Sequence, residues 1–159
     1  MLRTIPIEKE LTDALVSILD PILLDQLELY NHVKTAHWNL RDANFLVVHR
    51  FLDEVAAVVN ESGDIIAERI RQLGASVDAP SKRFSVEERL KPFPSAELDA
   101  EAALTGLCES FSGSIKGIRM GIERTTEGVT EEPVTNDILV AIATEYEKLL
   151  WMLNSHRTK

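Results

Sequence analysis

The sequence predicts an all-α protein that folds as a four-helix bundle. Apolar residues recur at steps of three and four positions along four long stretches, which is the period of amphipathic helices. No stretch shows a convincing alternation of apolar and polar residues, which would indicate a strand. At 159 residues the chain is long enough for one domain with a substantial core. We therefore expect a single bundle domain over residues 1–159.

The first helical pattern runs over residues 7–38, and its main helix is expected at about 21–38. The apolar positions that form its broad face are Leu11, Leu15, Ile18, Ile22, Leu27, Leu29 and Val33. Asp20 followed by Pro21 makes a good N-cap and first-turn pair, because proline lacks the backbone N–H that a helix start leaves unpaired. The region is therefore compatible with two helices or with one kinked helix.

A short connection at residues 40–44 leads to the second long helix, which is predicted over residues 45–73. Gly63 is its weak point, because a glycine inside a helix costs roughly 1 kcal/mol relative to alanine. We favour a continuous helix, since the polar face described below keeps its phase across Gly63, which would also let two helices approach closely. Gly74 is the expected C-terminal cap.

The connection at residues 75–95 is rich in proline and is expected to be irregular, with a short extra helix over residues 86–90. The third long helix is predicted over residues 96–124. A glycine stripe on it, which suits close packing against a neighbouring helix, consists of Gly113, Gly117 and Gly121. After a polar loop at residues 125–133, Thr135 or Asn136 is expected to cap a last helix that ends near Ser155.

Composition limits the classes of function. The formal net charge of −9 argues against a generally nucleic-acid-binding surface and for attraction of cations. The one cysteine, Cys108, excludes an intrachain disulfide framework, and we expect it to be a buried small hydrophobe in a reducing compartment. Neither a signal-peptide pattern nor an apolar stretch long enough to cross a bilayer is visible. We therefore expect a cytoplasmic protein with no membrane contact.

The predicted helix over residues 45–73 carries a histidine and acidic residues at helical spacing. His49 and Asp53 are four positions apart, as are Asp64 and Glu68, so each pair lies on one helix face. At ~100° per residue, all of these side chains fall within an arc of roughly 100°. Either pair alone would also fit an ordinary charged helix surface, but together they indicate a metal-binding face.

Distance separates the two pairs along this helix. Asp53 and Asp64 are eleven positions apart. That spacing is ~16 Å of helix, whereas a transition-metal ligand lies ~2 Å from its ion. One copy of the helix therefore cannot hold a single ion with both pairs. A second copy, antiparallel across a two-fold axis, would set the first pair of one chain against the second pair of the other. We expect the metal site to lie between subunits.

Several segments of the sequence resemble the Dps family, the miniferritins named as DNA-binding proteins from starved cells. The matching segments are KTAHWN, the ANF that follows it, HRFLDEV and DIIAERIRQLG, all within residues 34–74. The ending NDILVAIATEYEKLLWMLNS is similar to the last helix of that family, with Trp151 near the C-terminus. The resemblance implies a ferritin-like four-helix bundle that assembles into a hollow dodecamer.

Carried over residue by residue, the resemblance implies a di-iron ferroxidase centre shared by two subunits. The family's ligands fall on His37, His49 and Asp53 of one subunit and on Asp64 and Glu68 of its two-fold mate. Trp38 matches the family's tryptophan beside the di-iron centre, which can intercept oxidising equivalents. Without the resemblance, His37 would be interpreted as a capping or packing histidine at a helix end.

The resemblance also implies a function. The family oxidises Fe(II), preferentially with hydrogen peroxide rather than oxygen, and stores the ferric mineral inside its shell, which protects the cell against oxidative damage. Repeated over a shell, the acidic excess would draw ferrous ions inward. Candidates for pores or for a mineral-nucleating surface are Glu131, Glu132, Asp137, Glu145 and Glu147.

The sequence departs from the family in its tails. DNA-condensing members often carry a lysine-rich mobile tail, but the N-terminus here offers only Arg3 and Lys9 as basic residues. Phosphate contacts drive non-specific DNA affinity, so the tails do not favour DNA binding. A second departure is Asp42, where the family commonly has glycine. The alternative function is a nucleoid-associated, DNA-protecting shell in which the metal site is structural or weakly active.

Overall fold

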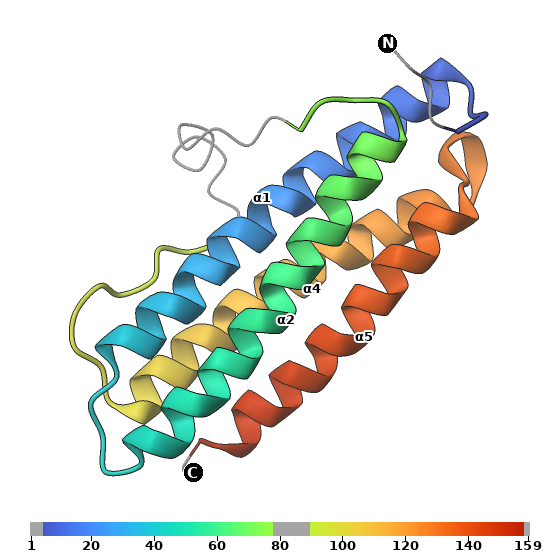
Figure 1. The fold of residues 1–159 in the computed structure, drawn as a ribbon. Coiled ribbons are helices and arrows are strands. Elements are labelled where there is room, and N and C mark those ends of the chain that lie inside the picture. Colours follow the sequence, from blue (N-terminus) through green and yellow to red (C-terminus); the bar gives the residue numbers. More distant parts are fainter. Residues whose placement is uncertain (1–4, 78–89, 158–159) are drawn as a thin grey trace.

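The structure is a computed structural model that describes residues 5–77 and 90–157. Within these ranges the elements are α1 (Lys9–Asn39), α2 (Phe45–Gln72), α4 (Ala100–Thr126), the short 3-10 helix η1 (Gly128–Thr130) and α5 (Pro133–Ser155). The four long helices lie side by side, and α2 ends and α4 begins at opposite ends of the bundle (Figure 1). The described ranges contain no strand, and an isolated bridge pairs Leu40 with Leu98. The predicted all-α four-helix bundle is confirmed.

The core lies between all four long helices. Its largest fully buried side chains are Leu15, Ile18, Leu19, Ile22, Leu29, Leu52, Ile66, Ile70, Leu104, Leu107, Phe111 and Tyr146. A polar link crosses it: the Tyr146 hydroxyl donates to Oε1 of Gln26, and Nε2 of Gln26 donates to Oγ of Ser114 at 3.2 Å. Because buried polar groups are costly unless they are hydrogen-bonded, this link favours one arrangement of α1, α4 and α5.

Helix α1 begins at Lys9 and runs without interruption through Pro21. The expected main-helix start at residue 21 is therefore wrong. A proline inside a helix costs ~3 kcal/mol, since it removes one hydrogen bond and crowds the preceding turn. Ile18 and Ile22, on either side of the proline, are buried in the core. Burial of a large aliphatic side chain contributes roughly 1.5–3 kcal/mol, so these two residues offset the cost.

Helix α2 is continuous through Gly63, as predicted. A β-carbon at Gly63 would lie 3.5 Å from Cβ of Gln26, so α1 and α2 approach closely at this point. The helix ends at Gln72, and Gly74 follows with a φ of 89°. This is the left-handed conformation that glycine adopts without steric cost after a helix end. The predicted cap at Gly74 is confirmed.

Helix α4 begins at Ala100, later than predicted, because Leu98 is held in an extended pairing. The Leu98 N–H donates to the Asn39 carbonyl oxygen at 2.9 Å, and the Leu98 carbonyl oxygen accepts from the Arg41 N–H at 2.8 Å. Asp99 then caps the helix, its side chain accepting from a backbone N–H of the first turn at 2.7 Å. The pairing ties the start of α4 to the end of α1.

Two members of the glycine stripe of α4, Gly113 and Gly121, pack closely against their neighbours, as predicted. A β-carbon at Gly113 would lie 2.9 Å from Cδ2 of Leu90. One at Gly121 would lie 2.8 Å from Cδ1 of Ile22. Both distances are shorter than real β-carbons show, so an alanine at either position would require the end of the Leu90 or Ile22 side chain to shift.

Helix α5 begins at Pro133, and its cap is Glu132, whose carboxylate accepts from two backbone N–H groups of the first turn. The prediction of Thr135 or Asn136 as the cap is wrong. Proline suits the first helical position, and a carboxylate is favoured beside the positive end of the helix dipole. Because of these two effects, the helix starts earlier in the sequence than predicted.

Three further expectations concern single features. The predicted short helix over residues 86–90 lies outside the described residues except for Leu90, which is not helical. Cys108 is buried, as predicted. Among the described residues, no helix is both long and apolar enough to span a membrane.

Candidate metal centre

The two histidines of the predicted site face each other where α1 ends and α2 begins. The rings of His37 and His49 stack, with centroids 3.7 Å apart and an interplanar angle of 21°. Nδ1 of each ring lies 3.1 Å from the backbone carbonyl oxygen of the other residue. A carbonyl oxygen only accepts hydrogen bonds, so Nδ1 carries the proton on both rings. Nε2 of each imidazole is therefore left with the lone pair that a metal requires.

Asp53 lies one turn further along α2 and completes a group of three side chains. One ligand atom from each of His37, His49 and Asp53 lies within 4.8 Å of the other two. Oδ1 of Asp53 is 3.5 Å from Nδ1 of His37. In residues 5–77 and 90–157, no other group of three or more histidine, cysteine or acidic side chains is close enough to share an ion. The three residues assigned to one subunit thus lie together.

The protonation states of this group suit metal binding. Burial lowers the pKa of His37, so its imidazole is neutral at neutral pH. The hydrogen bond from Lys34 lowers the pKa of Asp53, so its carboxyl group is ionised there. A neutral imidazole and an ionised carboxylate are the forms that coordinate metals.

Lys34 is a neighbour of this group that the sequence analysis did not single out. Its Nζ donates to Oδ1 of Asp53 at 3.0 Å and lies 5.6 Å from the centroid of the Trp38 ring. The Trp38 side chain, predicted to lie beside the site, is 70% exposed. Sequence spacing held a signal for Lys34, because it precedes His37 by three positions and Trp38 by four and so shares their helix face.

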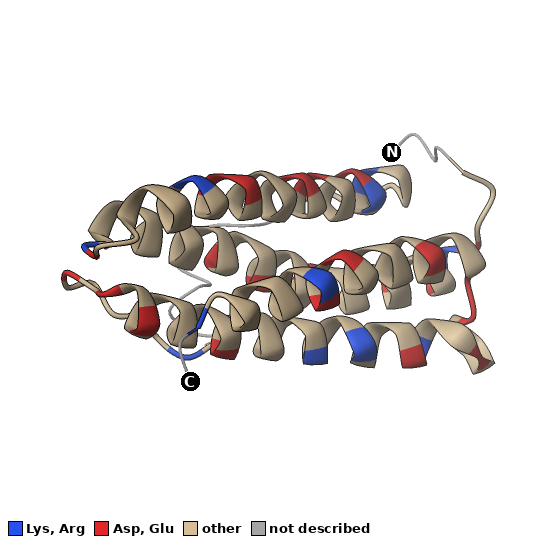
Figure 2. Cartoon of the chain, turned by 90° about the horizontal axis from the view of Figure 1, so that it is seen from below, with Lys and Arg blue, Asp and Glu red and all other residues tan. Residues whose placement is uncertain are grey.

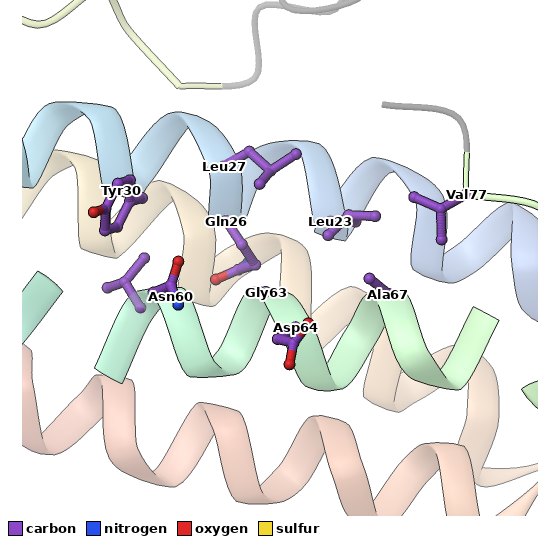
Figure 3. A pocket seen from close by; sticks show the side chains of 10 residues that line it. Leu23, Gln26, Leu27, Tyr30, Asn60, Gly63, Asp64, Ala67 and Val77 are labelled. Carbon is purple, nitrogen blue, oxygen red and sulfur yellow. The ribbon is translucent and has the colours of Figure 1, made fainter. Parts of the chain in front are cut away.

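Asp64 and Glu68 lie further along α2, exposed and outside the group of three. Asp64 lines a cavity of about 270 Å³ between α1 and α2. Figure 3 shows Tyr30 from α1 and Asn60 from α2 lining the same cavity. One chain therefore presents two separate sets of ligand candidates, as the helix arithmetic requires. That the two sets come together across a subunit interface stays a prediction.

The acidic residues expected at pores or on a nucleating surface divide into two kinds. Those with exposed side chains are Glu131, Asp137, Glu145 and Glu147. Glu132, in contrast, is 7% exposed, and its Oε2 accepts from Nη2 of Arg69 at 2.7 Å. The expectation for Glu132 is wrong, because its carboxylate caps α5 and pairs with a buried guanidinium.

Known proteins are similar to this chain in fold and in sequence. A family model described as the ferritin-like domain matches residues 16–159. The DNA protection during starvation protein of Agrobacterium fabrum is 32% identical over 141 residues, covering 89% of this chain and 86% of that protein. The protein of the same name from Mycolicibacterium smegmatis is 32% identical over 151 residues, covering 92% and 80%. The solved structure of Mycobacterium smegmatis Dps in a tetragonal form has a TM-score of 0.89 at 27% identity, covering 98% of this chain and 93% of that one.

These matches extend over nearly the whole chain. The family model spans every residue of the candidate site, from His37 to Glu68. The structural similarity covers all four long helices as well. The chain therefore belongs to the ferritin-like family, and within it to the DNA protection during starvation (Dps) proteins.

Proposed function

We propose that the protein is a ferroxidase and iron-storage protein, which oxidises Fe(II) and retains the ferric product inside a hollow assembly of identical subunits. The observation that carries this proposal is the stacked pair of His37 and His49 beside Asp53, with both Nε2 atoms left for coordination. Membership of the ferritin-like family supports it.

The donor atoms suit iron. Carboxylate oxygens are hard ligands and imidazole nitrogens are borderline ligands, and a metal that cycles between ferrous and ferric states uses both kinds. A closed structural zinc site takes four cysteine or histidine ligands and does not need several carboxylates. The candidate residues comprise two imidazoles, from His37 and His49, and carboxylates from Asp53, Asp64 and Glu68.

We infer that a second copy of the chain completes the centre. His37, His49 and Asp53 of one subunit would face Asp64 and Glu68 of its two-fold mate, which yields two equivalent sites per dimer. Large apolar side chains exposed on α2 and at the end of α1 are Trp38, Phe45, Leu46, Val47 and Ile65. Burial of such surface drives association, so these residues support an oligomer. A dodecamer is the assembly that the family resemblance implies.

The proposed reaction balances with one peroxide for each pair of iron ions. Each Fe(II) gives up one electron, and hydrogen peroxide takes both electrons with two protons to become two molecules of water. Because the two electrons go to the same peroxide, no hydroxyl radical is released. Oxygen is the alternative oxidant. The exposed Trp38 would intercept oxidising equivalents that leave the site.

Anaerobic loading with Fe(II) followed by titration with peroxide tests this function. The wild-type protein should form ferric product, detected by its absorbance, while a parallel mass measurement follows the particle. His49→Ala and Asp64→Ala should each lose most of the fast oxidation. Glu109→Ala, which changes an exposed carboxylate on α4, is the matched control and should behave like the wild type. Equal rates in the wild type and both site variants would overturn the proposal.

The second candidate function is the DNA-protecting shell. The names of the relatives from Agrobacterium fabrum and Mycolicibacterium smegmatis are compatible with it. Against it, Figure 2 shows Lys and Arg interspersed with Asp and Glu along the described helices. Arg157, near the C-terminus, donates to Glu101 at 3.1 Å. DNA retardation in a gel at moderate salt, abolished by removal of residues 156–159, would favour this candidate.

A further inference from the structure

We propose that two copies of Asn60 form a hydrogen-bonded pair across the two-fold axis of the dimer, and that this pair helps to set the register in which two α2 helices meet. The partner is a second copy of this chain. The inference rests on the proposed function, because the arrangement of the metal ligands gives the position of the axis. Asn60 is not one of those ligands, and the metal chemistry does not require an asparagine at this position.

The ligand candidates of α2 are placed symmetrically along the helix. His49 and Glu68 lie at equal distances from the point between residues 58 and 59, and so do Asp53 and Asp64. An antiparallel pair of α2 helices that completes both sites must have this point on its two-fold axis, because the axis maps each ligand set onto its copy. Side chains close to this point therefore meet their own copies.

Asn60 faces the partner in this arrangement. At ~100° per residue it falls inside the arc of roughly 100° that holds the ligand candidates. Its side chain is exposed in the single chain. Its copy across the axis lies three positions away, which is ~4.5 Å along the helix at 1.5 Å per residue. With helix axes ~8–10 Å apart, the two α-carbons are about 6–8 Å from each other, a distance that two asparagine side chains can span.

The surroundings of Asn60 suit such a pair. It lines the cavity of about 270 Å³ between α1 and α2, and Figure 3 shows the apolar side chains of Leu23 and Leu27 in the same cavity. Among residues 5–77 and 90–157, the Asn60 side chain has no hydrogen-bond partner. A carboxamide covered by a second chain costs free energy unless it is hydrogen-bonded, and two copies satisfy each other because each donates and accepts. A polar asparagine specifies register in coiled coils in the same way.

The same register brings together side chains that are complementary in charge and size. Arg50, exposed on α2, falls one position from Glu68 of the partner subunit. Ala57 falls opposite Asn60 of the partner subunit, and its small side chain leaves room for the carboxamide. A shift of four positions in one direction would separate the two copies of Asn60 by seven positions. The opposite shift would set Arg50 against Arg71 of the partner subunit, and like charges repel.

Cysteine cross-linking of the whole protein tests the position of the axis, in a Cys108→Ala background that removes the native thiol. Mild oxidation should join most Asn60→Cys chains into disulfide-linked dimers, because disulfides need α-carbons about 4.4–6.8 Å apart. Ala67→Cys, two turns further along α2, is the matched control, since its copies would be about 25 Å apart. Ala67→Cys should remain as single chains. Failure of Asn60→Cys to cross-link, or equal cross-linking at both positions, would overturn the inference.

A change from amide to carboxylate tests the hydrogen bond. Asn60→Asp keeps the shape of the side chain but sets two negative charges against each other across the axis. In a sedimentation dilution series, this variant should release single chains at a protein concentration about tenfold higher than the wild type does. Asn154→Asp makes the same change at an exposed position of α5 and should assemble like the wild type. Assembly of Asn60→Asp at the wild-type concentration would overturn the proposed pair.

Iron oxidation by the wild type, measured in parallel, separates this inference from the proposed function. Peroxide-dependent oxidation of Fe(II) without cross-linking of Asn60→Cys would overturn the inference alone. Cross-linking of Asn60→Cys together with no oxidation by the wild type would overturn the proposed function and support the pair.

Discussion

The main chain, and not the metal, orients the two imidazoles of the candidate centre. Each of His37 and His49 donates from Nδ1 to the backbone carbonyl oxygen of the other residue, both at 3.1 Å. The ring orientations therefore depend on the relative position of α1 and α2, which the core between them determines. A set of ligands oriented before binding loses less conformational entropy on binding. Half of the proposed centre is thus formed within a single chain.

His32 shows a different use of a buried imidazole. Its Nδ1 lies 2.9 Å from Oγ of Ser110, and this hydroxyl donates its own hydrogen to the Gly106 carbonyl oxygen at 3.0 Å. The hydroxyl can therefore only accept from His32, which places the proton on Nδ1. The ring of Phe93 lies 5.2 Å away. Burial lowers the pKa of His32 to about 4, so the imidazole is neutral in the folded protein at neutral pH.

We predict that His32 makes the fold sensitive to acid. Its folded pKa of about 4 lies below the value of ~6.5 expected for the unfolded chain, so the unfolded state binds the proton first. The stability it contributes is complete above about pH 6.5 and is lost, by about 3 kcal/mol, as the pH falls to 4. Urea denaturation of the metal-free protein at neutral pH and at about pH 4.5 should show the wild type losing about 2–3 kcal/mol more than His32→Gln. A parallel loss in both proteins would contradict the prediction.

At the element scale, a buried ion pair joins α2 to the start of α5. Nη2 of Arg69 lies 2.7 Å from Oε2 of Glu132, and Nε donates to Oγ1 of Thr135 at 3.1 Å. Burial alone would raise the pKa of Glu132, but hydrogen bonds from Thr135, Val134 and Arg69 bring it below its ordinary value. The carboxylate thus serves as a helix cap and as the partner of a guanidinium at the same time.

We predict that Glu132→Ala destabilises the fold by about 3–5 kcal/mol, because it leaves the Arg69 guanidinium buried without its partner and removes the cap of α5. Glu131→Ala changes the exposed neighbour and should stay within about 0.5 kcal/mol of the wild type. Chemical denaturation of the two variants measures the difference. Similar losses in both would mean that the Arg69–Glu132 pair contributes no specific stability.

A second prediction at this scale concerns the close approach of α4 to its neighbours. A β-carbon at Gly121 would lie 2.8 Å from Cδ1 of Ile22 and 3.0 Å from Cδ1 of Leu139. Overpacking in Gly121→Ala should therefore destabilise the bundle by about 1–3 kcal/mol. The higher helix propensity of alanine offsets about 1 kcal/mol of this loss. In Gly63→Ala, the new β-carbon would lie 3.5 Å from Cβ of Gln26, which is an ordinary contact distance. The monomeric chain should therefore lose no stability. A thermal unfolding series in which both variants match the wild type would rule out the packing constraint.

The elements differ in how much of them the sequence could predict. The apolar period of each long helix is local, so the bundle followed from the pattern of each stretch alone. The passage of α1 through Pro21 and the cap at Glu132 depend on burial against other helices and on Arg69, which no local pattern contains. In the same way, spacing on one helix indicated His49 and Asp53, whereas His37 required the family resemblance. Lys34 was missed because its partner Asp53 lies on a different helix.

At the scale of the whole molecule, the two sets of ligand candidates restrict how the centre can be assembled. His37, His49 and Asp53 lie where α1 ends and α2 begins, while Asp64 and Glu68 are exposed further along α2. Each chain would therefore contribute to two sites, one with each set. A variant that lacks one set would still supply the other set to its partner. Two chains that each lack a different set could therefore form one intact site together, which is impossible for a centre within one chain.

We predict that two inactive variants restore activity when their subunits are exchanged. His49→Ala and Asp64→Ala should each oxidise Fe(II) slowly as pure assemblies. After joint dissociation and reassembly, each mixed dimer contains one site with His49 from one chain and Asp64 from the other, both intact. Random mixing leaves about one quarter of all sites intact, so peroxide-dependent oxidation should recover to about one quarter of the wild-type rate. The same variants mixed without dissociation are the control. If reassembled mixtures stay as inactive as the separate variants, while their masses show exchanged subunits, the centre does not join His49 of one chain to Asp64 of another.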